Sequence, residues 1–322
     1  MGIVQSIFLA IFPGKPKFSV DEIPDLTGQV IIVTGANTGI GKETVKALLA
    51  HNAKVYIAAR NEEKTRVAIQ DLKAATGKEA YYLHLDLADL KAIKQAAAEF
   101  LRGVMTPPIE QTTADDYDLT FGTNALGHFY FTSLLLPTMS ATAKETGNPS
   151  RVATTCSLGS FFARSIDYET LKGASNPKRL KKGSQYMYAQ SKFANLVFAV
   201  ELARRYSGEG IVSIGVNPGN IQSDLQRHFG TLEHIFIDWM LFPTSMGALT
   251  QLYAGTVPEA EKYNGQGQLQ MQASERNCGI GWKHKSPMSK GSFLSLLSLS
   301  PFSNDTLLPA KAYMRTSTYL DP

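Results

Sequence analysis

Residues 30–41 have the sequence VIIVTGANTGIG, in which a continuous apolar run leads directly into a glycine-rich turn. Four apolar residues in a row are typical of a strand buried on both faces of a parallel sheet. The glycines allow a tight turn and the close approach of a pyrophosphate, and a helix starting at Ile40 would add amide donors and a favourable dipole. The stretch therefore predicts a strand, turn and helix that bind a nucleotide, although a plain glycine-rich connection stays open.

Strands and helices alternate on both sides of this stretch. We expect further strands over residues 54–59, 80–85, 151–156 and 211–216, and helices over 40–51, 62–75, 89–101, 115–139, 185–206 and 245–255. Strands that alternate with helices of this length form right-handed crossovers between parallel strands. The fold class is therefore α/β, with a Rossmann-like doubly wound parallel sheet.

The fourth strand of this alternation is missing. After the helix expected over 89–101, Val104 to Thr106 lead straight into Pro107-Pro108, which cannot pair in a sheet. Because neighbouring strands lie about 4.8 Å apart, losing an inner strand leaves a gap of roughly 10 Å. Two hypotheses follow: residues 100–105 replace the strand, or the chain is a spliced or misassembled variant with weakened folding and cofactor binding.

Composition limits the function classes. The chain has 322 residues, 43% of them hydrophobic, and a formal net charge of +4, so it has enough material for one α/β domain and no basic excess typical of a nucleic-acid binder. The basic residues between 178 and 182 are expected to lie in a solvated loop. We expect an apolar N-terminal segment over 1–24, the domain over 25–271 and a poorly ordered tail over 272–322.

Cysteines and histidines point to no metal site and no disulfide framework. The two cysteines are Cys156 and Cys278, and the histidines show no metal-ligand spacing, which favours a reducing, cytoplasmic setting. The apolar segment 3–12 is too short to span a bilayer. Packing on the protein surface and peripheral membrane contact both stay open for it, and Met1-Gly2 with Ser6 fits a loose myristoylation pattern.

The second strand ends in Ala58-Ala59-Arg60, without the acidic residue that would bind the ribose hydroxyls of NAD. Arg60, together with Lys42 in the first helical turn, instead suits a ribose phosphate and favours NADP. The alternative is a solvated arginine at the start of a loop.

Tyr188 and Lys192 are four residues apart in the run YAQSK, so an expected helix carries both on one face. A nearby ammonium stabilises a phenolate, and we therefore expect Lys192 to lower the pKa of Tyr188 and make it a proton donor and acceptor. The spacing alone also fits two unrelated surface residues.

Four motifs together resemble the short-chain dehydrogenase/reductase family, with the retinol-dehydrogenase-like group and its fungal relatives as the nearest match. They are TGANTGIG at 34–41, FGTNALGHF at 121–129, YAQSK at 188–192 and NPG at 217–219, and the resemblance covers about residues 25–265. The chain departs from the family at the missing strand, whose usual Asn-Asn-Ala-Gly end is absent, and at 266–270, a poor match for the last strand.

The resemblance implies a catalytic set and a cofactor site. Tyr188 would be the acid/base, Lys192 would lower its pKa and hold the nicotinamide ribose, Ser157 would bind the substrate oxygen, and Asn124 would complete the set through a water relay. The residues expected to bind NADP(H) are Gly35, Asn37, Thr38, Gly39, Ile40, Gly41, Lys42, Arg60, Asp86, Leu87, Asn124, Tyr188, Lys192, Pro218, Gly219, Ile221 and Ser223.

The expected reaction is the NADP(H)-dependent interconversion of a lipophilic alcohol and its aldehyde or ketone. Aromatic residues within 220–242 would form a substrate lid, with Phe161 and Phe162 as a further wall; each of them could equally complete the core. A tailoring step in fungal secondary metabolism, for example on a terpenoid, follows from the resemblance, and a homo-oligomer stays open. The rival hypothesis is a catalytically impaired binding or regulatory protein that keeps the family's fold.

Overall fold

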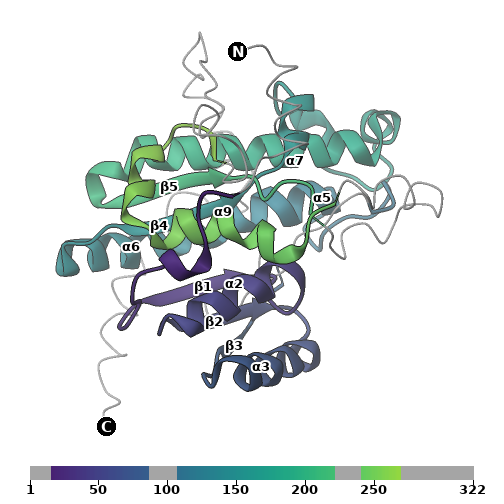
Figure 1. The fold of residues 1–322 in the computed structure, drawn as a ribbon. Coiled ribbons are helices and arrows are strands. Elements are labelled where there is room, and N and C mark those ends of the chain that lie inside the picture. Colours follow the sequence, from purple (N-terminus) through teal and green to yellow (C-terminus); the bar gives the residue numbers. More distant parts are fainter. Residues whose placement is uncertain (1–15, 87–106, 222–240, 270–322) are drawn as a thin grey trace, which may run out of the picture.

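The N-terminal half forms the strand and helix unit that the sequence predicts. The computed structural model describes residues 16–86, 107–221 and 241–269 (Figure 1). The first unit runs in the order β1 (Val30–Thr34), α2 (Gly39–Ala50), β2 (Lys54–Ala59), α3 (Glu62–Thr76) and β3 (Tyr81–His84). Its three strands are parallel, in the order β1-β2-β3.

The second unit is a parallel sheet in the order β4-β5-β6. Its strands are β4 (Ser150–Thr155), β5 (Ile211–Val216) and β6 (Gln268–Leu269). Its helices are α5 (Leu119–Phe121), α6 (His128–Thr146), α7 (Pro177–Tyr206) and α9 (Thr244–Thr256), with a π-helix over Gly122–Gly127 between α5 and α6. Short 3-10 helices occupy Val20–Glu22, Leu158–Phe162, Tyr168–Thr170, Ser207–Glu209 and Pro258–Tyr263.

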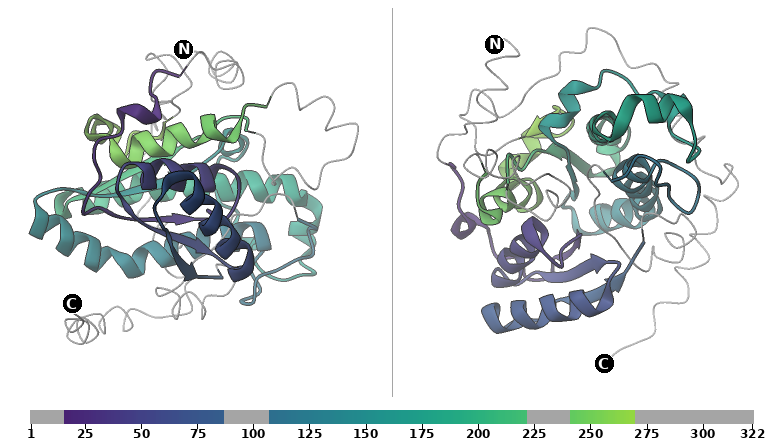
Figure 2. Two further views of the ribbon diagram at one scale, coloured as in Figure 1. Left: turned by 60° about the horizontal axis from the view of Figure 1, so that its bottom comes forward. Right: turned by 90° about the vertical axis from the view of Figure 1, so that its right-hand side faces the viewer.

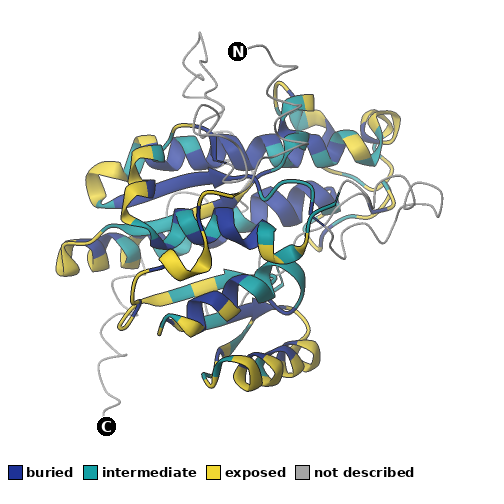
Figure 3. Ribbon diagram, viewed as in Figure 1, coloured by how far each residue is buried: buried dark blue, intermediate teal, exposed yellow. Residues whose placement is uncertain are grey.

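The two sheets share no hydrogen-bonded strand pair within the described residues, as the missing strand predicts. Every residue of β5 is buried, whereas Val30 and Ile32 of β1 are 61% and 38% exposed (Figure 3). A strand at the centre of a doubly wound sheet would be buried on both faces. The edge of β1 is therefore open as far as the described chain goes.

Helices α2 and α9 hold the two units together. They pack against each other, and α9 also contacts β4 and β5 (Figure 2). One apolar cluster joins Leu49 of α2 and Ile57 of β2 to Leu252 of α9 and Ile214 of β5. Burial of such side chains contributes about 1.5–3 kcal/mol each, so this layer is the main described link between the sheets.

Three expectations about elements are wrong. The helix expected from residue 115 begins only at Leu119, because Asp118 caps it by accepting a hydrogen bond from the Phe121 amide at 2.8 Å. The basic residues 178–182 lie in α7 rather than in a solvated loop, and Arg179 is fully buried. Finally, residues 266–270 were expected to be a poor match for the last strand of the family, but Gln268–Leu269 forms a strand that pairs with β5.

Several expectations fall on residues outside the described ranges. These are the apolar segment 3–12, the helix over 89–101, the replacement strand over 100–105, most of the aromatic lid and the tail over 272–322. Among the helices that the structure does describe, none combines the length and the apolar character needed to cross a bilayer.

Candidate active site

Helix α7 carries Tyr188 and Lys192 on one face, one turn apart. The Lys192 ammonium lies 5.9 Å from the centre of the Tyr188 ring and donates a hydrogen bond to the Thr155 carbonyl at 3.1 Å. Asn195, a further turn along, donates to the same carbonyl at 3.1 Å. The end of β4 therefore fixes the lysine next to the phenol, and the motif alone did not identify Thr155 or Asn195 as its supports.

Ser157 lies two residues after β4 and joins the same group. Its hydroxyl accepts a hydrogen bond from the Gly159 amide at 3.1 Å, and its side chain hydrogen-bonds with Tyr188. A Cβ on Gly159 would lie 3.1 Å from Cε1 of Tyr188, tighter than most real contacts. A glycine at this position thus leaves room for the Tyr188 ring beside the Ser157 hydroxyl.

Asn124 reaches the site from the π-helix before α6. Its Nδ2 donates to the Ser191 hydroxyl at 3.2 Å, and that hydroxyl donates to the Tyr188 carbonyl at 2.8 Å. Single-turn π-helices occur often at functional sites, and this one brings a buried amide against the helical turn that carries Tyr188. The structure therefore brings together all four residues expected to be catalytic.

Burial raises the pKa of Tyr188 above its ordinary value of 10.0, and the hydrogen bond with Ser157 opposes this only in part. Burial likewise lowers the pKa of Lys192. The pKa of Tyr188 is thus raised overall, because desolvation of the phenolate outweighs the hydrogen bond with Ser157. The Tyr188 hydroxyl stays protonated at neutral pH and is suited to donate a proton.

The glycine-rich turn between β1 and α2 fits a nucleotide. Gly39 has a φ of +56°, and a Cβ on Gly41 would lie 2.7 Å from the Ala36 Cα. Only glycine is compatible with this close approach of helix and turn. The Asn37 side chain in the turn is 4% exposed, yet its Oδ1 has no hydrogen-bond partner. A buried, unpartnered amide oxygen at a helix N-terminus is consistent with a ligand that binds there.

Residues of both units meet above the turn. Gly247 of α9 lies where they meet. A Cβ added to it would lie 2.8 Å from the Ile221 side chain and 3.0 Å from the side chain of Ile40, which follows the glycine-rich turn. Before Ile221, the Asn217 side chain accepts a hydrogen bond from the Gly219 amide at 3.1 Å and fixes the turn through Pro218. Ile40 and Ile221, two expected cofactor residues from different units, therefore lie close to each other.

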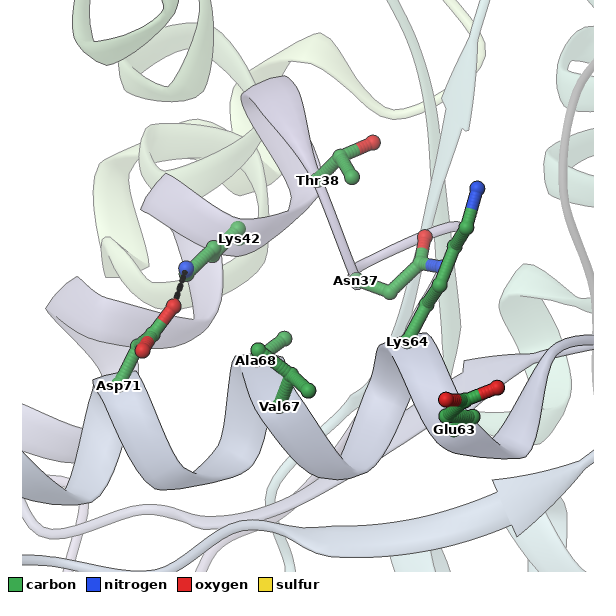
Figure 4. A pocket seen from close by; sticks show the side chains of 8 residues that line it. All are labelled: Asn37, Thr38, Lys42, Glu63, Lys64, Val67, Ala68 and Asp71. Carbon is green, nitrogen blue, oxygen red and sulfur yellow. Dashed lines mark hydrogen bonds and ion pairs between the residues drawn. The ribbon is translucent and has the colours of Figure 1, made fainter.

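Arg60 and Lys42, the two cations expected to bind the ribose phosphate, differ in the partners that they have in the structure. Arg60 is 61% exposed by its side chain and lies 3.9 Å from the Asp86 carboxylate, so these two expected cofactor residues are neighbours. Lys42, however, forms an ion pair with Asp71 of α3 at 2.6 Å. The structure thus directs Lys42 to a carboxylate on another helix, 29 positions further along the chain (Figure 4). Leu87 and Ser223 lie outside the described residues.

The aromatic residues expected around the substrate are only partly described. Phe162 is 73% exposed in the short helix after Ser157. Phe242 pairs through its backbone with Ile221, and its amide donates to the Asn220 carbonyl at 2.8 Å. Aromatic rings are thus present near two segments that carry site residues, the one after Ser157 and the one that ends at Ile221.

Comparisons with known proteins agree with this geometry. The family model of the short chain dehydrogenases matches residues 29–177. A short-chain dehydrogenase/reductase of Armillaria gallica is 52% identical over 83% of this chain and 89% of its own length. Retinol dehydrogenase 11 of Mus musculus is 37% identical over 80% of each chain.

A solved structure of an uncharacterised protein from Mycobacterium paratuberculosis superimposes with a TM-score of 0.57 at 28% identity, covering 74% of this chain and 80% of that one. The two sequence relatives each cover at least four fifths of this chain. The chain therefore belongs to the short-chain dehydrogenase/reductase family of oxidoreductases.

Proposed function

We propose that this oxidoreductase uses NADP(H) to interconvert a lipophilic alcohol and its aldehyde or ketone. The observation that carries the proposal is the cluster at the end of β4, where the Tyr188 phenol hydrogen-bonds with Ser157 and lies beside the Lys192 ammonium. Such a cluster provides one proton donor, one partner for the substrate oxygen and one fixed cation.

When bound, the nicotinamide cofactor supplies the hydride that adds to the carbonyl carbon in the reductive direction. The Tyr188 hydroxyl gives its proton to the carbonyl oxygen, which becomes the alcohol, and the Ser157 hydroxyl donates a hydrogen bond to the same oxygen. The Lys192 ammonium then stabilises the phenolate until solvent returns a proton. In the oxidative direction, each of these transfers is reversed.

The preference for NADP(H) over NAD(H) rests on Arg60. It follows β2 directly, where an acidic residue would bind the ribose hydroxyls of NAD, and an arginine suits a ribose phosphate.

The lipophilic substrate class rests on the apolar rings near the site and on the relatives. The mouse relative is named for retinol, a lipophilic alcohol, and the relatives from Armillaria gallica and Phomopsis amygdali are fungal. We therefore propose a tailoring step in fungal secondary metabolism, for example on a terpenoid.

Replacement of Tyr188 by phenylalanine tests the proposal. Y188F removes the proton donor but keeps the ring, so turnover of retinal with NADPH should fall by about 10²–10⁴-fold while NADPH affinity changes little. Tyr186 lies in the same helix outside the cluster, and Y186F should therefore keep wild-type turnover. Wild-type rates in Y188F would remove Tyr188 from its proposed role.

A second candidate is a binding or regulatory protein without turnover. The open edge of β1 and the lack of a described strand between β1 and β4 favour it, because the cofactor site spans the two sheets. Folded protein that neither binds NADPH nor reduces a carbonyl compound would support this candidate.

A further inference from the structure

Gln190 lies in α7 between Tyr188 and Lys192, and its side chain is fully buried. Because an α-helix has 3.6 residues per turn, Gln190 is directed about 200° away from Tyr188 around the helix axis. It therefore lies behind the helical turn that carries the site. A buried side-chain amide requires hydrogen-bond partners, and those of Gln190 show what holds this turn of α7 from behind.

Gln190 binds residues 167–171, which belong to the connection between Ser157 and α7. Its Oε1 accepts a hydrogen bond from the Asp167 amide at 2.6 Å, and its Nε2 donates to the Thr170 hydroxyl at 3.3 Å. That hydroxyl donates in turn to the Asp167 carbonyl at 2.7 Å. Since a backbone amide can only donate, the Gln190 oxygen must face Asp167, and both ends of the side chain have matched partners.

The far end of residues 167–171 is fixed to the start of the helix that carries Asn124. The Asp118 amide donates to the Leu171 carbonyl at 2.7 Å. Next to this bond, Tyr117 and Lys172 pair through their backbones, and the Lys172 ammonium lies 4.4 Å from the centre of the Tyr117 ring. Because Asp118 caps α5, and α5 continues into the π-helix of Asn124, residues 167–171 connect Gln190 to the element of another site residue.

Two links therefore join α7 to the element that carries Asn124. One is the direct hydrogen bond from Asn124 to the Ser191 hydroxyl at 3.2 Å, and the other runs from Gln190 through residues 167–171 to Asp118. Both α5 and the 3-10 helix Tyr168–Thr170 contact α7 (Figure 1). A single link would let α7 rotate about its axis, whereas two links on different sides of the helix restrict that rotation.

We propose that Gln190 is a positioning residue, which sets the rotation of α7 so that the Tyr188 hydroxyl reaches the oxygen of the substrate. This inference rests on the proposed function and adds a residue that acts on the site only through α7. A displacement of about 1 Å in a reacting group can slow a reaction by about 10²-fold, so a small rotation of the helix is sufficient for a large effect.

Replacement of Gln190 by methionine tests the proposal. Methionine has a similar length but can neither accept from Asp167 nor donate to Thr170. In a single turnover of retinal with bound NADPH, followed by rapid mixing, Q190M should lower the rate constant by about tenfold or more. The affinity for NADPH and the number of binding sites, both measured by calorimetry, should not change. A purely structural role would instead lower the amplitude of the turnover, because fewer molecules would be folded, and would leave the rate constant unchanged.

Two variants of Thr170 test the link from its other side. T170V removes the partner of the Gln190 amide and should lower the rate constant, whereas T170S keeps the hydroxyl and should behave as the wild type does. The double variant Q190M/T170V should be no slower than the slower single variant, because both changes break the same link. A rate constant in T170S as low as that in T170V would contradict a link through the hydroxyl.

Gln185 provides the matched control. It is an exposed glutamine of the same helix, so Q185M should keep the wild-type rate constant.

The outcomes separate this inference from the proposed function. Wild-type protein that reduces neither retinal nor any other lipophilic carbonyl compound would overturn the proposed function and the role of Gln190 with it. Wild-type turnover with an unchanged rate constant in Q190M would overturn the role of Gln190 alone and leave the proposed function standing.

Discussion

At the scale of single residues, burial shifts four titratable groups at the site toward their uncharged forms. It raises the pKa of Tyr188, lowers that of Lys192, lowers that of His128 to about 4 and raises that of Cys156 to about 12. Perturbed pKa values cluster at functional sites. This desolvation strengthens each hydrogen bond in the cluster, and it keeps a proton on Tyr188 for donation.

His128 makes stability depend on pH. Its pKa is lowered from 6.5 to about 4 by burial and by the nearby Lys192 ammonium, so the unfolded chain binds more protons than the folded chain between these two values. The stabilising contribution is complete above pH 6.5 and is lost as the pH falls toward 4. By linkage it amounts to about 3 kcal/mol.

Urea unfolding at pH 7 and at pH 4.5 tests this prediction. The free energy of unfolding should fall less over this interval in H128Q than in the wild type, with a difference of about 2–3 kcal/mol, because glutamine does not titrate. Equal losses in the two proteins would show that His128 is not held neutral in the folded state.

The sequence was sufficient to predict the residues that lie close together along one element. Tyr188 and Lys192 share a helical face, and Ser157 follows a strand end that any parallel sheet directs to the same edge. The ion pair of Lys42 with Asp71 was not predictable, because the two residues are 29 positions apart on different helices.

At the scale of elements, local chemistry set most boundaries. Helix α3 begins after Asn61, whose side chain accepts from the Lys64 amide at 2.8 Å, and ends at Gly77 with a φ of 71°. The predicted helix boundaries were wrong where the capping signals in the sequence were weak. Gly183, with a φ of 78°, permits a kink inside α7 and lets the basic residues before it form a helix, which the charge pattern alone did not indicate.

Hydrogen exchange of the backbone amides tests whether the edge of β1 is open. β5 is paired on both sides and β1 only with β2 among the described strands, so amides of β5 should exchange much more slowly than the outward-facing amides of β1. Protection of β1 as strong as that of β5 would contradict an open edge and would instead require a pairing segment outside the described ranges.

At the scale of the whole molecule, the described residues form two units, each with part of the expected site, which are joined mainly through helices rather than through a continuous sheet. The glycine-rich turn, Asn37 and Arg60 belong to the first unit, while Ser157, Tyr188 and Lys192 belong to the second. The adjacent prolines 107 and 108 were sufficient to predict that the described residues place no strand between β1 and β4. The packing of α2 against α9, with Ile40 and Ile221 meeting at Gly247, depends on contacts far apart in sequence and was not predicted.

The most direct test of the central claim is the consumption of NADPH by purified wild-type protein and Y188F, with retinal and a series of lipophilic aldehydes and ketones. We predict that the wild type oxidises NADPH with at least one of these carbonyl compounds, releases the matching alcohol and prefers NADPH to NADH, whereas Y188F binds NADPH but is inactive. Wild-type protein that binds NADPH and consumes it no faster than Y188F with every compound would contradict the account.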